Sequence, residues 1–125
     1  MASEAQHQAA VIKWSQKPSI RRRWPELALL HHIPNGGTRD VIEAKHLKEQ
    51  GVKRGVPDLC LPVPRAGFHG LYIELKTEKG RANNDQKWWG EQLTAQEYCW
   101  RVCLGWESAV QTIEAYLEGA VHGGI

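Results

Sequence analysis

The chain has 125 residues, of which 42% are hydrophobic and 24% are charged, and this length and composition are typical of one globular domain. No apolar run approaches the roughly 20 residues that span a bilayer, and residues 1–6 lack the basic and apolar segments of a secretion signal. Three cysteines are an odd number for a disulfide framework, so we expect a single domain over residues 1–125 in the cytoplasm, with reduced thiols and no membrane partner.

The net charge is only +2, but the charges are unevenly distributed along the chain. Residues 1–65 hold 11 Lys and Arg against 6 Asp and Glu, whereas residues 66–125 hold 5 against 8. The basic half includes the arginine run 21–23 and the pair Lys53 and Arg54. Such clusters neutralise phosphates in nucleic-acid-binding proteins, although a short basic cluster is as often a solvated surface.

The first predicted elements are a helix and a short strand. Ser3 is expected to cap a helix over residues 3–14, with Gln6 completing a capping box and apolar side chains recurring at helical spacing. Residues 17–19, which include a proline, are expected to break this helix. The apolar run over 26–33 lies between two prolines, and we interpret it as a short strand.

Glycines mark the next two boundaries. Asn35, Gly36 and Gly37 predict a tight turn, because these residue types tolerate positive φ angles. A second helix is expected over 40–50, since Gly51 stands where a C-cap glycine belongs.

The remaining elements predict a mixed sheet covered by helices on both faces. Residues 58–63 read as a strand whose proline makes it end early or lie at an edge, and 71–76 form the clearest strand of the chain. A helix over 83–98, a strand over 100–106 and a helix over 107–117 follow. Two adjacent strands joined by a short loop and flanked by helices indicate an α/β fold.

Three side chains of this predicted sheet form a candidate site. Glu74 and Lys76 are two residues apart on one strand, so they project from the same face, while Asp58 begins the preceding strand. If the two strands pair, Asp58 and Glu74 converge. Neighbouring carboxylates repel each other, and a divalent cation removes that penalty.

The chemistry of this set suits phosphodiester hydrolysis. Carboxylate oxygens are ligands for Mg²⁺ or Mn²⁺, and such a metal activates a water molecule and stabilises charge on a phosphoryl oxygen. Lys76 is placed to orient that water or to neutralise negative charge. The alternative is an exposed Glu and Lys on the wet face of a strand, with Asp58 in a turn.

The combined motif resembles a known nuclease family. Residues 53–59, the run 71–76 and the spacing of Asn83, Gln86 and Trp88 are similar to the virus-type replication-repair nuclease (VRR-NUC) domain, which belongs to the PD-(D/E)XK superfamily. The similarity extends over nearly the whole chain. It implies a restriction-endonuclease-like core, which is a mixed central β-sheet flanked by α-helices.

The resemblance also implies roles for individual residues. Asp58 and Glu74 match the metal-binding acids, the backbone carbonyl of Leu75 would be a further ligand, and Lys76 matches the catalytic lysine. Gln86 matches a family glutamine that orients the substrate phosphate or the active-site water. Its alternative role is a capping box with the helix N-cap.

Other matches concern the first helix and the nucleic-acid contacts. Glu4 matches an acidic residue that reaches the metal or its waters in similar nucleases, although it is also a favourable charge at a helix N-terminus. Lys53 and Arg54 are candidates for phosphate contacts. The turn of Asn35, Gly36 and Gly37 matches a glycine turn where DNA approaches the backbone, or it is only a tight turn.

Tryptophans and cysteines outside the motif add further expectations. Trp88 and Trp89 are adjacent on a predicted helix, so they face different ways. We expect Trp89 to pack on the sheet and the more exposed Trp88 to form a packing or subunit contact, with stacking on a base as the alternative. The cysteine spacing does not suit zinc, and no Gly-Lys-Ser/Thr phosphate loop supports a nucleotide cofactor.

These observations leave three functional hypotheses. The first is a Mg²⁺- or Mn²⁺-dependent endonuclease that hydrolyses DNA, and the resemblance implies a homodimer that acts on branched DNA such as four-way junctions. The second is a non-catalytic nucleic-acid-binding module on a decayed nuclease fold. The third is an interaction factor that uses the tryptophan-rich helix. The presence of Asp58, Glu74 and Lys76 together favours the first.

Overall fold

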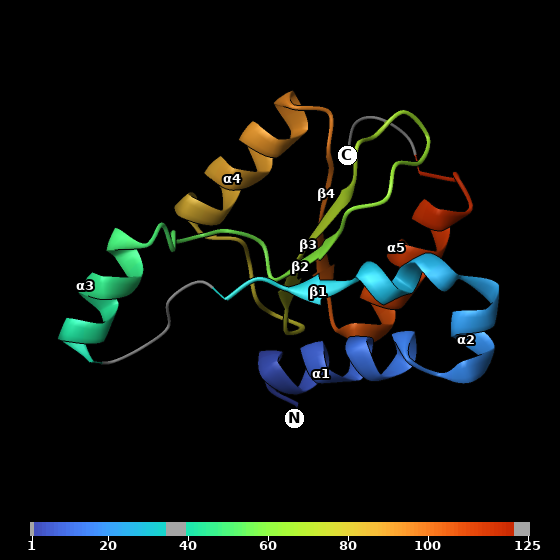
Figure 1. Cartoon of the computed structure of the whole chain (residues 1–125), viewed down its shortest axis with the longest axis horizontal. Helices are drawn as coiled ribbons and strands as arrows, with labels where there is room; N and C mark the ends of the chain where they lie inside the picture. The colour runs from blue at the N-terminus through green and yellow to red at the C-terminus, as the bar shows by residue number, and fades with distance from the viewer. Residues whose placement is uncertain (1, 35–39, 122–125) are drawn as a thin grey trace.

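The computed structural model describes residues 2–34 and 40–121, which form a mixed sheet with helices on both faces (Figure 1). In chain order the elements are α1 (Glu4–Ser15), α2 (Pro18–Arg23), the 3₁₀ helix η1 (Pro25–Leu29), β1 (His31–His32), α3 (Val41–Glu49), β2 (Leu59–Leu61), β3 (Leu71–Lys76), α4 (Asn84–Ala95), β4 (Cys99–Leu104) and α5 (Trp106–Leu117). None of these helices is long and apolar enough to cross a membrane. The predicted turn at residues 35–37 lies outside the described part of the chain.

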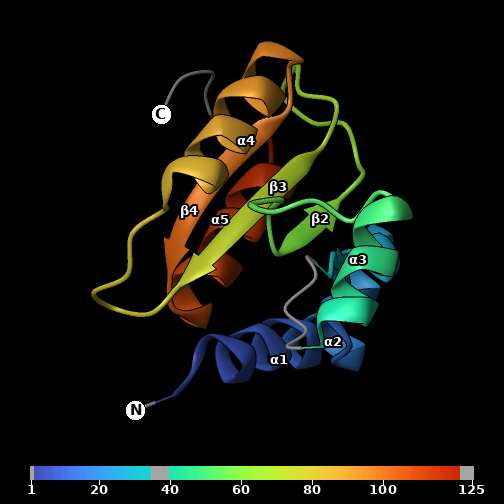
Figure 2. The same cartoon turned by 90° about the vertical axis from the view of Figure 1, so that its left-hand side faces the viewer.

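The sheet has four strands in the order β1-β2-β3-β4. β2 pairs antiparallel with both β1 and β3, whereas β3 and β4 run parallel and are connected by α4. α4 lies on one face of the sheet and α5 on the other (Figure 2). The predicted mixed sheet flanked by helices is therefore confirmed.

The hydrophobic core lies on the α5 face of the sheet. Leu71, Ile73 and Leu75 alternate along β3 and are each about 1% exposed. They pack with α5 and α1, of which Ile113 and Val11 are fully buried. Because side chains alternate along a strand, Glu74 and Lys76 project from the opposite face, on which α4 lies.

The structure contains the capping box predicted for the first helix and the glycine predicted at the end of the second, and it corrects the segment between these helices. Ser3 and Gln6 form a capping box at the start of α1, and Asp40 caps α3, after which Gly51 adopts a φ of 98°. α1 does end before the break expected at 17–19, but an interruption at Pro18 itself is wrong, because Pro18 occupies the first turn of α2. Proline is favourable there, since its missing N–H has no partner within a helix anyway.

The predicted strand over 26–33 is also wrong. Residues Pro25–Leu29 form the 3₁₀ helix η1, and only His31–His32 form a strand. In η1 and its cap, Leu27 and Leu30 are buried while Leu29 is 51% exposed, which matches the three-residue period of a 3₁₀ helix. A short apolar run does not distinguish this period from that of a strand.

Of two further boundaries, one agrees with the prediction and one differs from it. β2 ends at Leu61, directly before Pro62, as expected from a residue that donates no backbone hydrogen bond. α4 ends at Ala95, three residues before the predicted end, because Glu97 adopts a φ of 68°. The N–H of Tyr98 then donates to the carbonyl of Leu93, which gives a helix terminus that usually contains glycine.

Candidate active site

The antiparallel pairing of β2 and β3 brings Asp58 and Glu74 together. Leu59 pairs with Ile73, so one step further along the same register sets Asp58 against Glu74. The Asp58 Oδ2 atom accepts a hydrogen bond from the backbone N–H of Leu75 at 2.7 Å. The Asp58 side chain thus accepts the hydrogen bond that the backbone of a longer β2 would accept. This bond to β3 fixes the direction of the side chain.

Glu74 is buried in a polar environment on the α4 face of the sheet. It is only 1% exposed, and its Oε2 atom accepts a hydrogen bond from Gln86 Nε2 at 3.1 Å. The Lys76 Nζ atom lies 3.9 Å from the same oxygen, and its side chain is 11% exposed. The other oxygen, Oε1, is buried and receives no hydrogen bond from any described residue.

Gln86 combines the two roles that the sequence presented as alternatives. Its Oε1 atom accepts from the N–H of Asn83 at 2.8 Å, and its own N–H donates to Asn83 Oδ1, which completes a capping box. Its Nε2 atom donates to Glu74 at the same time. Because the cap fixes the amide, Gln86 presents a donor and not an acceptor to the carboxylate.

The pKa of Glu74 is raised from 4.5 to about 9. Burial is the main cause, followed by the neighbouring Asp58 carboxyl group and its negative charge. The positive charge of Lys76 opposes this rise in the pKa. Without a bound cation, Glu74 is therefore protonated at neutral pH, and a divalent cation beside it would favour the carboxylate instead.

Glu4 faces the same site from the first turn of α1. Its side chain is exposed, and its negative charge also raises the pKa of Glu74. α1 begins directly at Glu4 because Ser3 caps the helix, and α1 packs against β3. The predicted third acid therefore lies within electrostatic range of Glu74, and no direct contact joins the two.

The donor set at this site fits a hard divalent cation. Asp58 and Glu74 offer carboxylate oxygens, and the unpartnered Oε1 of Glu74 is a buried oxygen that a cation would satisfy. The Leu75 carbonyl points to the same side of β3 as its N–H, which is the side of Asp58. No cluster of three or more His, Cys, Asp or Glu side chains suited to a metal occurs in residues 2–34 and 40–121, so water or substrate oxygens would complete the coordination.

The loop that carries Lys53 and Arg54 is fixed against α4. Trp89 Nε1 donates to the Arg54 carbonyl at 2.9 Å, so Trp89 faces this loop and not, as was predicted, the sheet, and α4 meets the sheet through Gln86 and Gly90. Gly55 has a φ of 82°, and a Cβ atom there would lie 2.6 Å from the Asp85 carbonyl carbon. The sequence did not predict this contact, and Gly55, two residues before the Pro57-Asp58 pair, was its only signal.

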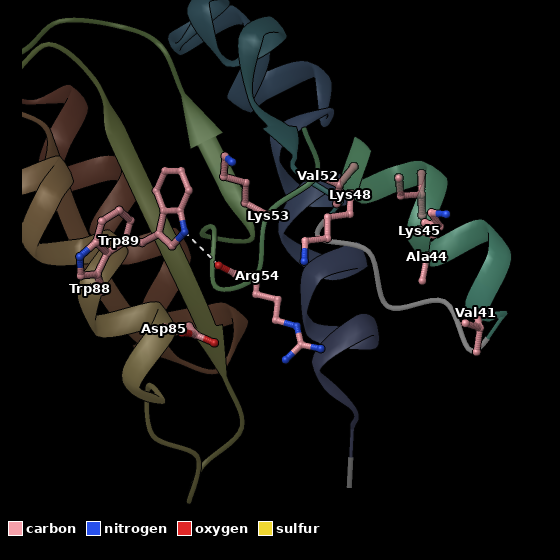
Figure 3. A pocket seen from close by; sticks show the side chains of 11 residues that line it. Val41, Ala44, Lys45, Lys48, Val52, Lys53, Arg54, Asp85, Trp88 and Trp89 are labelled. Atoms are coloured by element: carbon pink, nitrogen blue, oxygen red, sulfur yellow. Dashed lines mark hydrogen bonds between the residues drawn. The ribbon is translucent and has the colours of Figure 1, made fainter. Parts of the chain in front are cut away.

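Of the predicted nucleic-acid contacts, the structure describes Lys53 and Arg54. Lys53 and Arg54 are exposed and lie beside α4 within a few residues of Asp58 (Figure 3). Asn35, Gly36 and Gly37 lie outside the described residues. The lysines of α3 that share a groove with Lys53 and Arg54 were missed, because no local pattern predicts that α3 and α4 face each other.

Comparisons with known proteins agree with this geometry. The profile of the VRR-NUC domain matches residues 2–107. A solved structure described as a VRR_NUC domain protein is 30% identical in sequence and superposes with a TM-score of 0.82, covering 100% of this chain and 98% of that one. No curated protein matches the sequence.

Proposed function

Because the chain belongs to the VRR-NUC family of nuclease domains, we propose that it is a Mg²⁺- or Mn²⁺-dependent endonuclease that hydrolyses DNA phosphodiester bonds. The observation that carries this proposal is the buried Oε1 atom of Glu74, which has no described hydrogen-bond donor and lies beside a second carboxyl group. A purely structural glutamate at this depth would be expected to have both oxygens satisfied. Asp58, Glu74 and the Leu75 carbonyl would hold the metal.

The protein's own groups divide the remaining work. A bound divalent cation would supply Lewis-acid stabilisation of the phosphoryl oxygens and a more acidic water molecule. Lys76 would hold a positive charge next to the scissile phosphate, where negative charge develops. Gln86 would keep Glu74 Oε2 in a fixed direction, which leaves Oε1 for the cation. Glu4, at the rim of the site, would interact with the metal through water molecules.

We further propose that the substrate is branched DNA and that the active form is a homodimer. The stand-alone nucleases that the sequence resembles act in this way on four-way junctions. Two copies would supply two cutting sites and a longer basic surface than one 125-residue chain offers.

The test is cleavage of supercoiled and four-way-junction DNA in the presence of Mn²⁺. Asp58→Ala and Lys76→Ala are each expected to lower the rate at least about 100-fold, as removal of one charge-stabilising group does in other enzymes. Lys13→Ala, on the last turn of α1, is the charge-matched control and should cut like the wild type. Equal cutting by the wild type and Lys76→Ala would refute the proposal.

The same assay distinguishes the alternative of a non-catalytic binding module. Such a module would cut none of the substrates with any metal, yet would still bind DNA with an affinity that falls steeply with salt. The presence of all three residues of the motif favours the enzyme.

A further inference from the structure

A broad groove separates α3 from the first turns of α4 (Figure 3). Its volume is about 990 Å³, and it is lined from three directions: by α3, by the loop before β2 and by α4. α3 has no buried residue and stands apart from the sheet (Figure 1), so this wall of the groove is open to solvent. The groove therefore has room for a polymer that passes through it.

The groove is strongly cationic. Lys45 and Lys48 on α3 and Lys53 and Arg54 on the loop line it, against a single carboxylate, that of Asp85. All four cationic residues are exposed, and none of them forms an ion pair with any residue that the structure describes. Four uncompensated positive charges around one groove attract a polyanion.

The opposite wall carries an aromatic platform. Trp88 is 55% exposed, and its ring meets Trp89 edge to face with the centroids 5.8 Å apart. Trp89 is itself held by its hydrogen bond to the Arg54 carbonyl. The Trp88 ring is thus packed against Trp89 while it remains accessible to solvent. An exposed aromatic ring held in this way can stack on an unpaired base. A base pair inside a duplex does not expose such a face.

Two of the segments that line the groove continue into the carboxylate site. Asp85, on its floor, precedes Gln86, which donates to Glu74. The loop that bears Arg54 continues through Gly55, packed on Asp85, to Asp58. The groove therefore neighbours the site through α4 and through the loop that bears Arg54.

We propose that the groove between α3 and α4 binds a single-stranded segment of nucleic acid, with its phosphates on Lys45, Lys48, Lys53 and Arg54 and one unpaired base stacked on Trp88. This inference rests on the proposed nuclease function and adds a requirement to it: the substrate has unpaired nucleotides next to the cut. A second copy of the chain is the competing occupant, since Val41 and Ile42 on α3 are 82% and 68% exposed. The cationic lining disfavours it, because the cores of protein interfaces are depleted in lysine.

The test measures binding without cleavage. A fluorescent 20-nucleotide single strand and the blunt duplex of the same sequence are titrated with protein in EDTA, and anisotropy gives both dissociation constants. Trp88→Ala is expected to weaken binding of the single strand roughly 5- to 150-fold and to leave duplex binding within about twofold. Trp88→Phe, which keeps a ring, should retain most of the affinity.

The cationic wall is tested by salt dependence. The double variant Lys45→Ala/Lys48→Ala should reduce the slope of log K against log salt for the single strand by about 1.4, since each phosphate contact contributes about 0.7. Lys13→Ala/Lys17→Ala removes the same charge at the α1–α2 junction and should leave the slope unchanged. This measurement remains decisive if Trp88→Ala is poorly folded.

Three outcomes would overturn the inference. One is an unchanged single-strand affinity of folded Trp88→Ala together with an unchanged salt slope of the lysine variant. Another is an equal loss of single-strand and duplex binding in Trp88→Ala. The third is a change of either variant from dimer to monomer by light scattering, which would assign the groove to a second copy. Because no cleavage is required, a catalytically inactive wild type that binds as expected contradicts the proposed function and not the groove.

Discussion

Glu74 is the residue on which the site depends, and its environment makes a prediction about pH. Its pKa is about 9 in the folded protein and 4.5 when unperturbed, so the folded state keeps a proton that the unfolded chain releases. Its contribution to stability is fully present below about pH 4.5 and is lost as the pH rises toward about 9. The metal-free protein is therefore expected to become less stable across this window.

Thermal unfolding in EDTA between pH 5 and pH 9 measures this effect. Glu74→Gln removes the titrating group and should flatten the dependence, so that the variant melts above the wild type at pH 9. Glu78→Gln, an exposed acid of the following loop, should melt like the wild type at every pH. A wild-type midpoint that rises from pH 5 to pH 9, in parallel with Glu74→Gln, would contradict the assignment.

Variants of Gln86 and Asn83 distinguish the capping of α4 from the positioning of Glu74. Both substitutions to Ala break the capping box and are expected to cost about 1 kcal/mol of stability. Only Gln86→Ala also removes the donor to Glu74, so only this variant should lose cleavage well beyond its loss of stability. Urea denaturation and cleavage rates measured on the same samples check this. Equal activity of the two variants would mean that Gln86 acts only as a capping residue.

At the scale of elements, the position of α4 decides where Gln86 and the groove lie. Gly90 allows this position, because a Cβ atom there would overlap the indole ring of Trp100 on β4. Gly90→Ala is therefore expected to destabilise the protein by about 1–3 kcal/mol, although alanine has the higher helix propensity. Gln92→Ala, on the exposed side of the same helix, is the control.

Urea midpoints of these two variants are compared with the wild type. A stabilised Gly90→Ala would mean that helix propensity outweighs packing and that α4 is free to shift on the sheet. A Gln92→Ala midpoint close to that of the wild type would show that the effect belongs to the contact with Trp100.

The elements also show which features the sequence predicts well. The caps at Ser3 and Asn83, the glycine Gly51 after α3 and the apolar alternation of β3 are local patterns, and the structure contains them as predicted. The convergence of Asp58 and Glu74 followed because one short loop joins two strands, which leaves little choice of pairing. Local patterns with one consistent geometry were therefore sufficient for the centre of the site.

Other features were not predictable from local patterns. The 3₁₀ helix Pro25–Leu29 has an apolar run that is too short to show its period. α4 ends on Glu97 in a left-handed conformation that usually indicates glycine, so the sequence carried no stop signal there. Trp89 donates a hydrogen bond to the loop of Arg54, and this contact depends on tertiary packing alone.

At the scale of the whole molecule, the chain places its charges where a nuclease would need them. The acids Asp58, Glu74 and Glu4 gather at one end of the sheet: Asp58 directly precedes β2, Glu74 lies on β3 and Glu4 lies on α1. The cationic residues Lys45 and Arg54, which form no ion pair within the described part of the chain, lie in the groove beside it. A small net charge of +2 thus conceals a separation of positive and negative regions that composition alone does not reveal.

The most direct test of the central claim is the anomalous scattering of Mn²⁺ in crystals of the protein. The expected result is a peak about 2 Å from carboxylate oxygens of both Asp58 and Glu74 and from the Leu75 carbonyl, with Lys76 adjacent. Asp58→Ala crystals grown in the same way should lose the peak. Wild-type crystals with Mn²⁺ bound elsewhere, or with no peak between these carboxyl groups at high Mn²⁺ and pH 8, would contradict the account.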